Sequence, residues 1–156
     1  MENTIVEISI HPPHDYLQQN LSELMPSCPT ENIWTIIVLQ QANLPLTEDI
    51  PGVQAEKDRL RDKFIGLVEA ICDRLSDGHN TFTDGFDPRT GTPLHSPPGT
   101  LTHSDVAAVR AALGYDLIPG ECAAISHPDW GTAVYPSVII STAEREAIES
   151  AIATLI

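Results

Sequence analysis

The residues best suited to chemistry lie in one stretch, Gly114 to Thr132, which reads GYDLIPGECAAISHPDWGT. A glycine turn (Ile118, Pro119, Gly120) is followed directly by Glu121 and Cys122. A thiol beside a glycine turn, with an imidazole and an indole a few residues further on, can form a platform for a ligand. The stretch therefore predicts a binding site whose candidate residues are Gly120, Glu121, Cys122, His127 and Trp130.

Cys122 supports two interpretations. A lone cysteine in a short strand usually fills a small space in the core. However, strand alternation places Cys122 on the face of Ala124 and Ser126, away from the large apolar Ile125. A free thiol is only a few per cent thiolate at neutral pH, and Glu121 next to it disfavours the thiolate further, which argues against a redox role. A soft metal ion deprotonates its own thiol ligand, so metal ligation stays open beside core filling.

His127 and Trp130 also have two interpretations. A His-Pro pair often starts a turn, and a tryptophan before a glycine often fills a core. Alternatively, the imidazole and the indole form the rim of a pocket. A zinc site from the scattered His79, His95 and His103, together with Cys122 and His127, would match no known ligand spacing, so we expect no structural zinc.

Composition excludes several classes of partner. The chain has 156 residues and a formal net charge of −14, which repels nucleic acid and anionic lipid and favours a basic partner surface. The longest apolar run, Ile36 to Leu39, is far too short to span a membrane. No signal peptide is visible, and three cysteines are too few for a disulfide framework. We therefore expect a cytoplasmic protein that binds neither nucleic acid nor membrane.

The sequence contains no motif of a familiar enzyme. A glycine-rich phosphate loop, a Walker lysine and a G-x-S-x-G nucleophile motif are all missing. In the segment Thr81 to Gly91, TFTDGFDPRTG, the carboxylates Asp84 and Asp87 could bind a cation, but an aspartate in a turn normally caps its own backbone. We therefore expect structural carboxylates here, and a protein that is not an enzyme.

Hydrophobic periodicity predicts alternating strands and helices. The longest helix is expected over Gln54 to Ser76, with one apolar stripe formed by Leu60, Phe64, Leu67, Val68, Ile71 and Leu75. Several predicted strands follow one another without a helix between them, which favours an α+β fold with a mixed or antiparallel sheet in one domain, 1–156. Strands are expected over Thr4–Ile10, Ile33–Gln41, Thr81–Phe86, Cys122–Ser126 and Ala133–Ser141. The remaining helices are expected from Pro13 to Pro26, from a Thr102–Asp105 capping box to Leu113, and after a cap at Ser141 or Thr142.

Proline gives one further expectation about the sheet. Pro136 lies inside the predicted strand Ala133–Ser141. Because proline lacks a backbone N–H, it predicts that this strand is an edge strand or contains a bulge.

An ordered set of short motifs resembles a known family. It comprises Asp62-Lys63-Phe64-Ile65 in the long helix, Phe86-Asp87-Pro88-x-x-Gly91, Leu113-Gly114-Tyr115, and Cys122 followed by His127-x-x-Trp130-Gly131-Thr132, with Val6-Glu7 near the start. Together, over nearly the whole chain, they resemble the methylmalonic aciduria and homocystinuria type D family, which traffics cobalamin.

The resemblance implies a fold and a function. It implies a nitroreductase-like α+β domain without flavin chemistry and without enzymatic activity. It also implies an adaptor for cobalamin that works with a type C-like cobalamin-processing protein and directs the cofactor to methionine synthase and methylmalonyl-CoA mutase. A cysteine of the glycine-containing loop ligates the cobalt of the partner-held cobalamin in that family.

This chain differs from the family at the cysteine. Family members carry two adjacent cysteines after the glycine, and the first is the cobalt ligand, whereas this chain has Glu121-Cys122. Three interpretations therefore stay open: an adaptor that ligates cobalt through Cys122, a scaffold that has lost cobalt ligation, and a small nitroreductase-like enzyme that binds flavin. With only 8 Lys and Arg in total, the chain offers no evident basic site for a flavin phosphate.

Overall fold

A four-stranded antiparallel sheet forms the centre of the protein. A computed structural model describes residues 4–76, 81–118 and 124–155. The elements are β1 (Val6–His11), α1 (Asp15–Leu24), β2 (Trp34–Gln41), α2 (Val53–Leu75), β3 (Thr83–Gly85), α3 (Asp105–Leu113), β4 (Asp116–Ile118), β5 (Ala124–Ser126), β6 (Val134–Ser141) and α4 (Arg145–Ala153). The sheet has the strand order β1-β2-β6-β3, and β4 and β5 form a separate hairpin. The α+β class with an antiparallel sheet is therefore confirmed.

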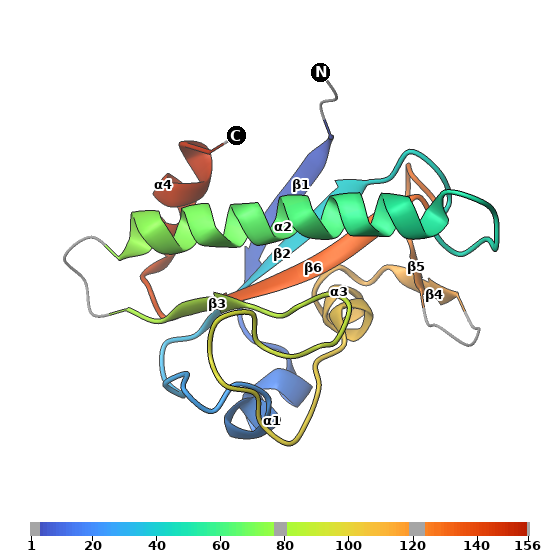
Figure 1. Cartoon of the computed structure of the whole chain (residues 1–156). Helices are drawn as coiled ribbons and strands as arrows, with labels where there is room; N and C mark the ends of the chain where they lie inside the picture. The colour runs from blue at the N-terminus through green and yellow to red at the C-terminus, as the bar shows by residue number, and fades with distance from the viewer. Residues whose placement is uncertain (1–3, 77–80, 119–123, 156) are drawn as a thin grey trace.

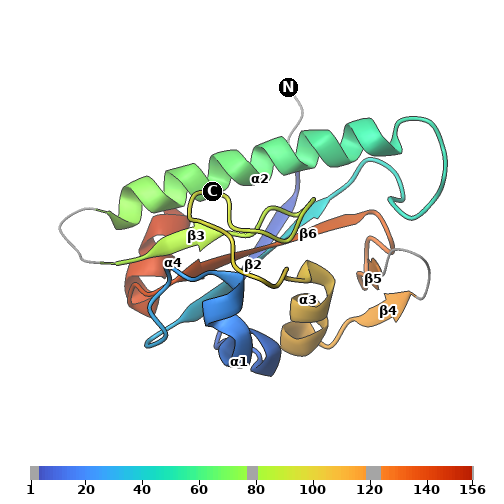
Figure 2. The same ribbon diagram turned by 60° about the horizontal axis from the view of Figure 1, so that its bottom comes forward.

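Helices cover both faces of the sheet. In Figures 1 and 2, α2 and α4 lie on one face, and α1 and α3 lie on the other. Strand β2 explains this arrangement, because its side chains alternate between two buried clusters: Ile36 and Val38 pack with Phe64 of α2, while Ile37 and Leu39 pack with Val109 of α3. A strand that is apolar on both faces is stable only if both faces are covered.

The apolar stripe of α2 packs on the sheet as its spacing predicts. Leu60, Phe64, Val68, Ile71 and Leu75 are all buried, and Leu67 is partly buried against the same cluster. The helix begins at Val53 and ends at Leu75. No helix in the described ranges is long and apolar enough to cross a membrane.

The expectation that Pro136 marks an edge strand or a bulge is wrong. Strand β6 lies in the interior of the sheet, between β2 and β3. The N–H of Ala42 donates to the carbonyl of Ala133, and with the observed register this makes Tyr135 and Ser137, not Pro136, the residues bonded to β2. The nitrogen of Pro136 points to the other side, where β3 pairs only with Ile139 to Ser141. No ladder hydrogen bond is lost, so a central strand tolerates this proline.

Two predicted helix caps are also wrong. The N-cap of α3 is Ser104, whose hydroxyl accepts from the N–H of Ala107, instead of Thr102. The N-cap of α4 is Glu144, because the backbone stays extended beyond β6. The Ser141 hydroxyl instead accepts from the N–H of Ala143 and so turns the chain between the two elements.

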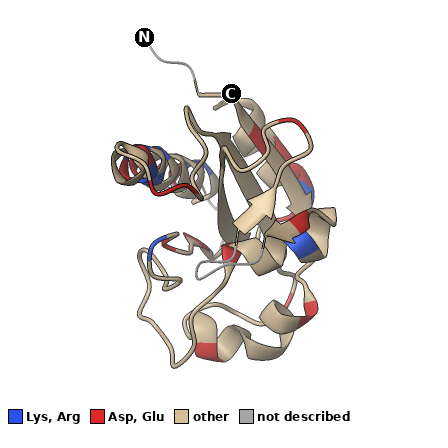
Figure 3. Ribbon diagram, turned by 90° about the vertical axis from the view of Figure 1, so that its right-hand side faces the viewer, with Lys and Arg blue, Asp and Glu red and all other residues tan. Residues whose placement is uncertain are grey.

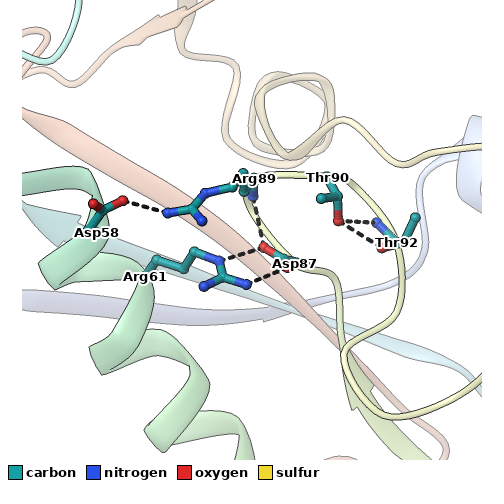
Figure 4. A network of polar contacts seen from close by, with 6 residues as sticks. All are labelled: Asp58, Arg61, Asp87, Arg89, Thr90 and Thr92. Atoms are coloured by element: carbon teal, nitrogen blue, oxygen red, sulfur yellow. Dashed lines mark hydrogen bonds and ion pairs between the residues drawn. The ribbon is translucent and has the colours of Figure 1, made fainter. Parts of the chain in front are cut away.

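An ion-pair network fixes the turn after β3 to α2 (Figure 4). Arg61 of α2 donates two hydrogen bonds to the Asp87 carboxylate, at 2.8 and 2.6 Å, and this pairing lowers the pKa of Asp87. Asp87 also accepts from the N–H of Arg89, whose side chain reaches Asp58 of α2. Asp87 is thus a structural carboxylate, as its place in a turn predicts.

Gly91 closes the same turn where no other residue fits. Its φ is +74°, and a Cβ built on it would lie 2.5 Å from the carbonyl oxygen of His103. The N–H of His103 donates to the carbonyl of Gly91 at 2.8 Å. The Phe86-Asp87-Pro88-x-x-Gly91 motif therefore brings the segment before α3 into contact with the turn after β3.

Truncation of Phe64 tests the core between α2 and the sheet. Phe64 is 1% exposed, and its deletion leaves a cavity lined by packed side chains. We expect Phe64→Ala to lower the free energy of unfolding by about 3–5 kcal/mol, measured by urea denaturation. Glu69→Ala, on the exposed side of the same helix, is the matched control and should change stability by less than about 0.5 kcal/mol. A Phe64→Ala variant as stable as the parent would contradict the core assignment.

Candidate functional site

The predicted binding stretch is built around the β4–β5 hairpin. Asp116 pairs with Ser126, and Ile118 pairs with Ala124. Ile125 of β5 is buried against Val109 of α3, which attaches the hairpin to the helical layer. Gly120, Glu121 and Cys122 belong to the segment 119–123 that joins the two strands, and they lie outside the described residues.

Strand β4 is absent from the sequence prediction. The strand consists of Asp116, Leu117 and Ile118. The sequence pattern instead predicts that Ile118 begins a turn. Three residues are too few to show a period of two, so only the pairing with β5 identifies the strand.

His127 lies in a buried cluster at the end of β5. Its Nδ1 accepts from the backbone N–H groups of Asp129 and Trp130, at 3.0 and 3.1 Å. Because a backbone N–H can only donate, the proton of the neutral ring is on Nε2, which donates to Oε1 of Glu7 at 2.7 Å. The ring stacks on Trp130, with centroids 3.9 Å apart and planes at 6°. It also makes an edge-to-face contact with Tyr115, with ring centroids 5.5 Å apart.

This geometry limits what His127 can do chemically. Both ring nitrogens are bonded to protein groups, so the imidazole can act as a base or a metal ligand only after one of these bonds breaks. The indole of Trp130 is partly exposed and offers an apolar surface beside the hairpin. The structure therefore brings together two of the five predicted residues, His127 and Trp130, in a cluster that fixes the base of the hairpin.

Glu7 is the member of this cluster that the sequence analysis did not include in the site. It stands 120 residues before His127, so no local pattern joins the two. The available signals were strand alternation, which places Glu7 opposite the apolar side chains of β1, and its place in the family pattern Val6-Glu7. Its carboxylate is half-exposed, at 49%, and ties the turn after β5 to the edge strand of the main sheet.

The histidines considered for zinc do not converge. His103 is buried, donates from Nδ1 to Oδ1 of Asp105 at 3.0 Å, and stacks on Phe86, while His95 is exposed. Among the residues that the structure describes, no three or more His, Cys, Asp or Glu side chains form a group that could hold a metal ion. His79 and Cys122 lie outside the described ranges.

Asp84 is fully engaged by protein donors. Its carboxylate is 1% exposed and accepts from the backbone N–H groups of Gly85, His95 and Ser96 and from the Ser96 hydroxyl. It therefore holds the loop after β3 against the sheet, in the structural role expected of it.

The described residues near the hairpin are poor in cations. Five of the 8 Lys and Arg lie on α2, at positions 57, 59, 61, 63 and 74, whereas α1 has none and α3 has only Arg110. Figure 3 shows acidic residues on the helical layer that contains α1 and α3. A phosphate group would find few charged partners on this side of the sheet.

Comparison with known proteins identifies the family that this chain matches. The family model described as methylmalonic aciduria and homocystinuria type D protein matches residues 1–153. The chain is 26% identical over 149 residues to the cobalamin trafficking protein CblD of Gallus gallus and 27% identical to that of Homo sapiens. Each match covers 94% of this chain and 49% of the relative, so the chain spans about half the length of the relatives it matches.

Substitution of His127 tests the cluster at the base of the hairpin. His127→Phe keeps an aromatic ring over Trp130 but leaves two backbone N–H groups without their acceptor, so we expect the free energy of unfolding to fall by about 1–3 kcal/mol. Glu7→Gln is the control, because its amide oxygen can still accept from Nε2, and it should change stability by less than about 0.5 kcal/mol. Equal stability of His127→Phe and the parent in urea denaturation would contradict the described hydrogen bonds.

The partly buried His14 predicts a dependence of stability on pH. The pKa of His14 is lowered from its usual 6.5, mainly by burial and then by the nearby His103, while Asp15 opposes the shift. Since the unfolded chain binds this proton more tightly, the stability due to His14 is complete above pH 6.5 and is lost as pH falls through that value. We therefore expect the free energy of unfolding, measured by urea denaturation, to fall between about pH 7.5 and about pH 5.5. This fall should be smaller in His14→Gln than in the parent. His95→Gln, at an exposed histidine, is the control and should show the same fall as the parent. If the fall in His14→Gln also equals that of the parent, His14 does not cause the pH dependence.

Proposed function

Since the chain belongs to the methylmalonic aciduria and homocystinuria type D family, we propose that it is a cobalamin-trafficking adaptor. Under this proposal residues 1–156 act as one type D-like domain that catalyses no reaction itself. The domain works with a type C-like cobalamin-processing protein and directs the cofactor to methionine synthase and methylmalonyl-CoA mutase. The observation that carries the proposal is the family match over residues 1–153, within which the candidate segment 119–123 joins the two strands of the β4–β5 hairpin.

Cys122 is the thiol that we assign to cobalt. The other two cysteines are unsuitable, because Cys28 is buried in the core and Cys72 is partly buried against it. Burial, followed by the charge of Asp84, also raises the pKa of Cys28 to about 12 and that of Cys72 to about 11. Their sulfur atoms also donate to the carbonyls of Pro29 and Thr83. On ligation, Cys122 would release its proton to solvent and supply a soft thiolate ligand to the cobalt.

The other candidate residues assist this ligation in our proposal. Gly120 stands two residues before the thiol, and Glu121 stands where the family carries its first cysteine. Trp130 contacts the apolar edge of the corrin, and the His127–Glu7 pair holds the turn that presents the indole. The cobalamin itself is held with or by the partner protein.

Two other functions predict different spectra. A nitroreductase-like enzyme would carry flavin and be yellow, and the low number of cations on α1 and α3 disfavours a flavin phosphate there. A scaffold that has lost cobalt ligation would be colourless and leave the spectrum of partner-bound cobalamin unchanged. A ligating adaptor would be colourless and change that spectrum.

Cysteine substitutions test the ligation. With a type C-like protein and cobalamin, the parent chain should change the visible absorption of the cobalt, and Cys122→Ser should abolish the change with little effect on melting temperature. Glu121→Cys should strengthen it, since it restores the family's cysteine pair. Cys28→Ser and Cys72→Ser are matched controls that should keep the change, because neither sulfur is the assigned ligand.

A different result would remove Cys122 from the site. If Cys122→Ser lowers the free energy of unfolding by about 1–3 kcal/mol, as the loss of a buried group does, and the cobalamin spectrum is unaffected, then Cys122 fills the core. The adaptor would in that case act through surface contacts alone.

A further inference from the structure

Strand β1 ends the main sheet with an open edge. The sheet order β1-β2-β6-β3 leaves one side of β1 without a strand among the described residues. The N–H of Gln41 donates to the carbonyl of Ile5 at 2.9 Å, and with the observed register this makes the odd-numbered residues of β1 the ones bonded to β2. The N–H and C=O groups of Val6, Ile8 and Ile10 therefore point outward, and no described backbone group bonds to them.

An apolar groove lies beside this edge on the α2 face. It has a volume of about 410 Å³ and extends between β1, β2 and α2. Its lining is mostly apolar and includes Val6 and Ile8 of β1, Val38 of β2, and Phe64 and Leu67 of α2, together with one charged side chain, Lys63 of α2. Val6 and Ile8 thus contribute both outward backbone groups and part of the groove wall, so a chain that paired with the edge would place alternate side chains next to the groove.

The opposite face of β1 is acidic. Glu7 pairs in register with Leu39, whose side chain belongs to the cluster on the α3 face. Glu7 is half-exposed there, so a strand added to β1 would place its other set of side chains beside this carboxylate. The net charge of −14 also attracts a basic segment.

The edge has little protection against pairing. Edge strands are commonly protected by charged side chains, proline or a bulge, whereas β1 carries one charged side chain, Glu7, has no proline and pairs with β2 without interruption. A second copy of the chain is an unsuitable occupant, because two antiparallel β1 strands would bring two Glu7 carboxylates onto one face of molecules that each carry a net charge of −14.

We propose that β1 is a docking edge for an extended segment of a partner protein in which apolar and basic residues alternate. The segment pairs with Val6, Ile8 and Ile10 through its backbone, inserts its apolar side chains into the groove and places its basic side chains beside Glu7. This is strand addition, in which backbone hydrogen bonds supply affinity and alternate side chains supply specificity. The inference does not depend on cobalamin, because the outward backbone groups and the groove belong to β1, β2 and α2; Glu7 alone is shared with the His127 cluster.

A pair of methylated peptides tests the docking edge. The probe is a capped peptide of about seven residues that alternates valine and lysine, titrated into the full chain at physiological salt and followed by fluorescence polarisation. Methylation of the backbone nitrogens that face β1 should weaken binding by roughly tenfold or more, whereas methylation of the alternate nitrogens should leave it unchanged. A valine–glutamate peptide is the charge control and should bind more weakly than the valine–lysine peptide.

A protein variant supports the same test. Ile8→Pro removes an outward N–H, which an edge strand tolerates, together with the Ile8 side chain of the groove wall, and should weaken binding of the valine–lysine peptide. Ile8→Val keeps the N–H and most of the side chain and should retain binding. The methylated pair needs no variant, so the test stands even if Ile8→Pro fails to fold. If both methylation patterns leave binding unchanged, the peptide binds by charge alone, and if both weaken it equally, no single backbone register is used; either result would overturn the proposal. A dimer in sedimentation that Ile8→Pro converts to a monomer would assign the edge to a second copy and overturn it as well.

Discussion

The burial of β2 on both faces is the constraint on which the rest of the structure depends. Ile36 and Val38 face α2, while Ile37 and Leu39 face α3. Each face must be covered, and the antiparallel pairing with β1 and β6 fixes which residues of those strands face which helices. The layered architecture follows from this one strand, because a shift of one residue would exchange the two faces of every neighbouring strand.

The two faces carry different kinds of structure. The α2 face is a regular helix-on-sheet core. The opposite face is covered by α1, α3, the hairpin and long connections, which are held by specific polar and aromatic contacts such as His103 with Asp105 and Phe86. The stability of this layer therefore depends more on individual residues. Most of the motifs that resemble the family also lie in this layer. The segment 119–123 therefore belongs to a hairpin that is positioned by side chains from distant parts of the chain, Glu7 among them.

The two proposed binding regions use different physics. In the proposed function, the hairpin segment would offer one polarisable thiol to a metal ion carried by another protein, and the specificity of that contact would come from coordination chemistry. The edge of β1 offers unpaired backbone groups beside an apolar groove, and its specificity comes from the alternation of side chains. The net charge of −14 favours a basic partner surface in either case, because such a field attracts basic groups at long range.

The sequence by itself determined the elements with a strong period: the apolar stripe of α2, the double-sided β2 and the turn that ends at Gly91. These patterns arise from local geometry, so they can be read without the fold. Only the tertiary structure decided that β6 is central despite Pro136, because the direction in which a proline nitrogen points depends on the register with β2. It likewise decided that Glu7 meets His127 and that β4 pairs with β5, because contacts between residues distant in sequence, or within very short strands, leave no periodic signal. For the candidate site, the sequence identified His127 and Trp130, and the fold supplied the partners that fix them.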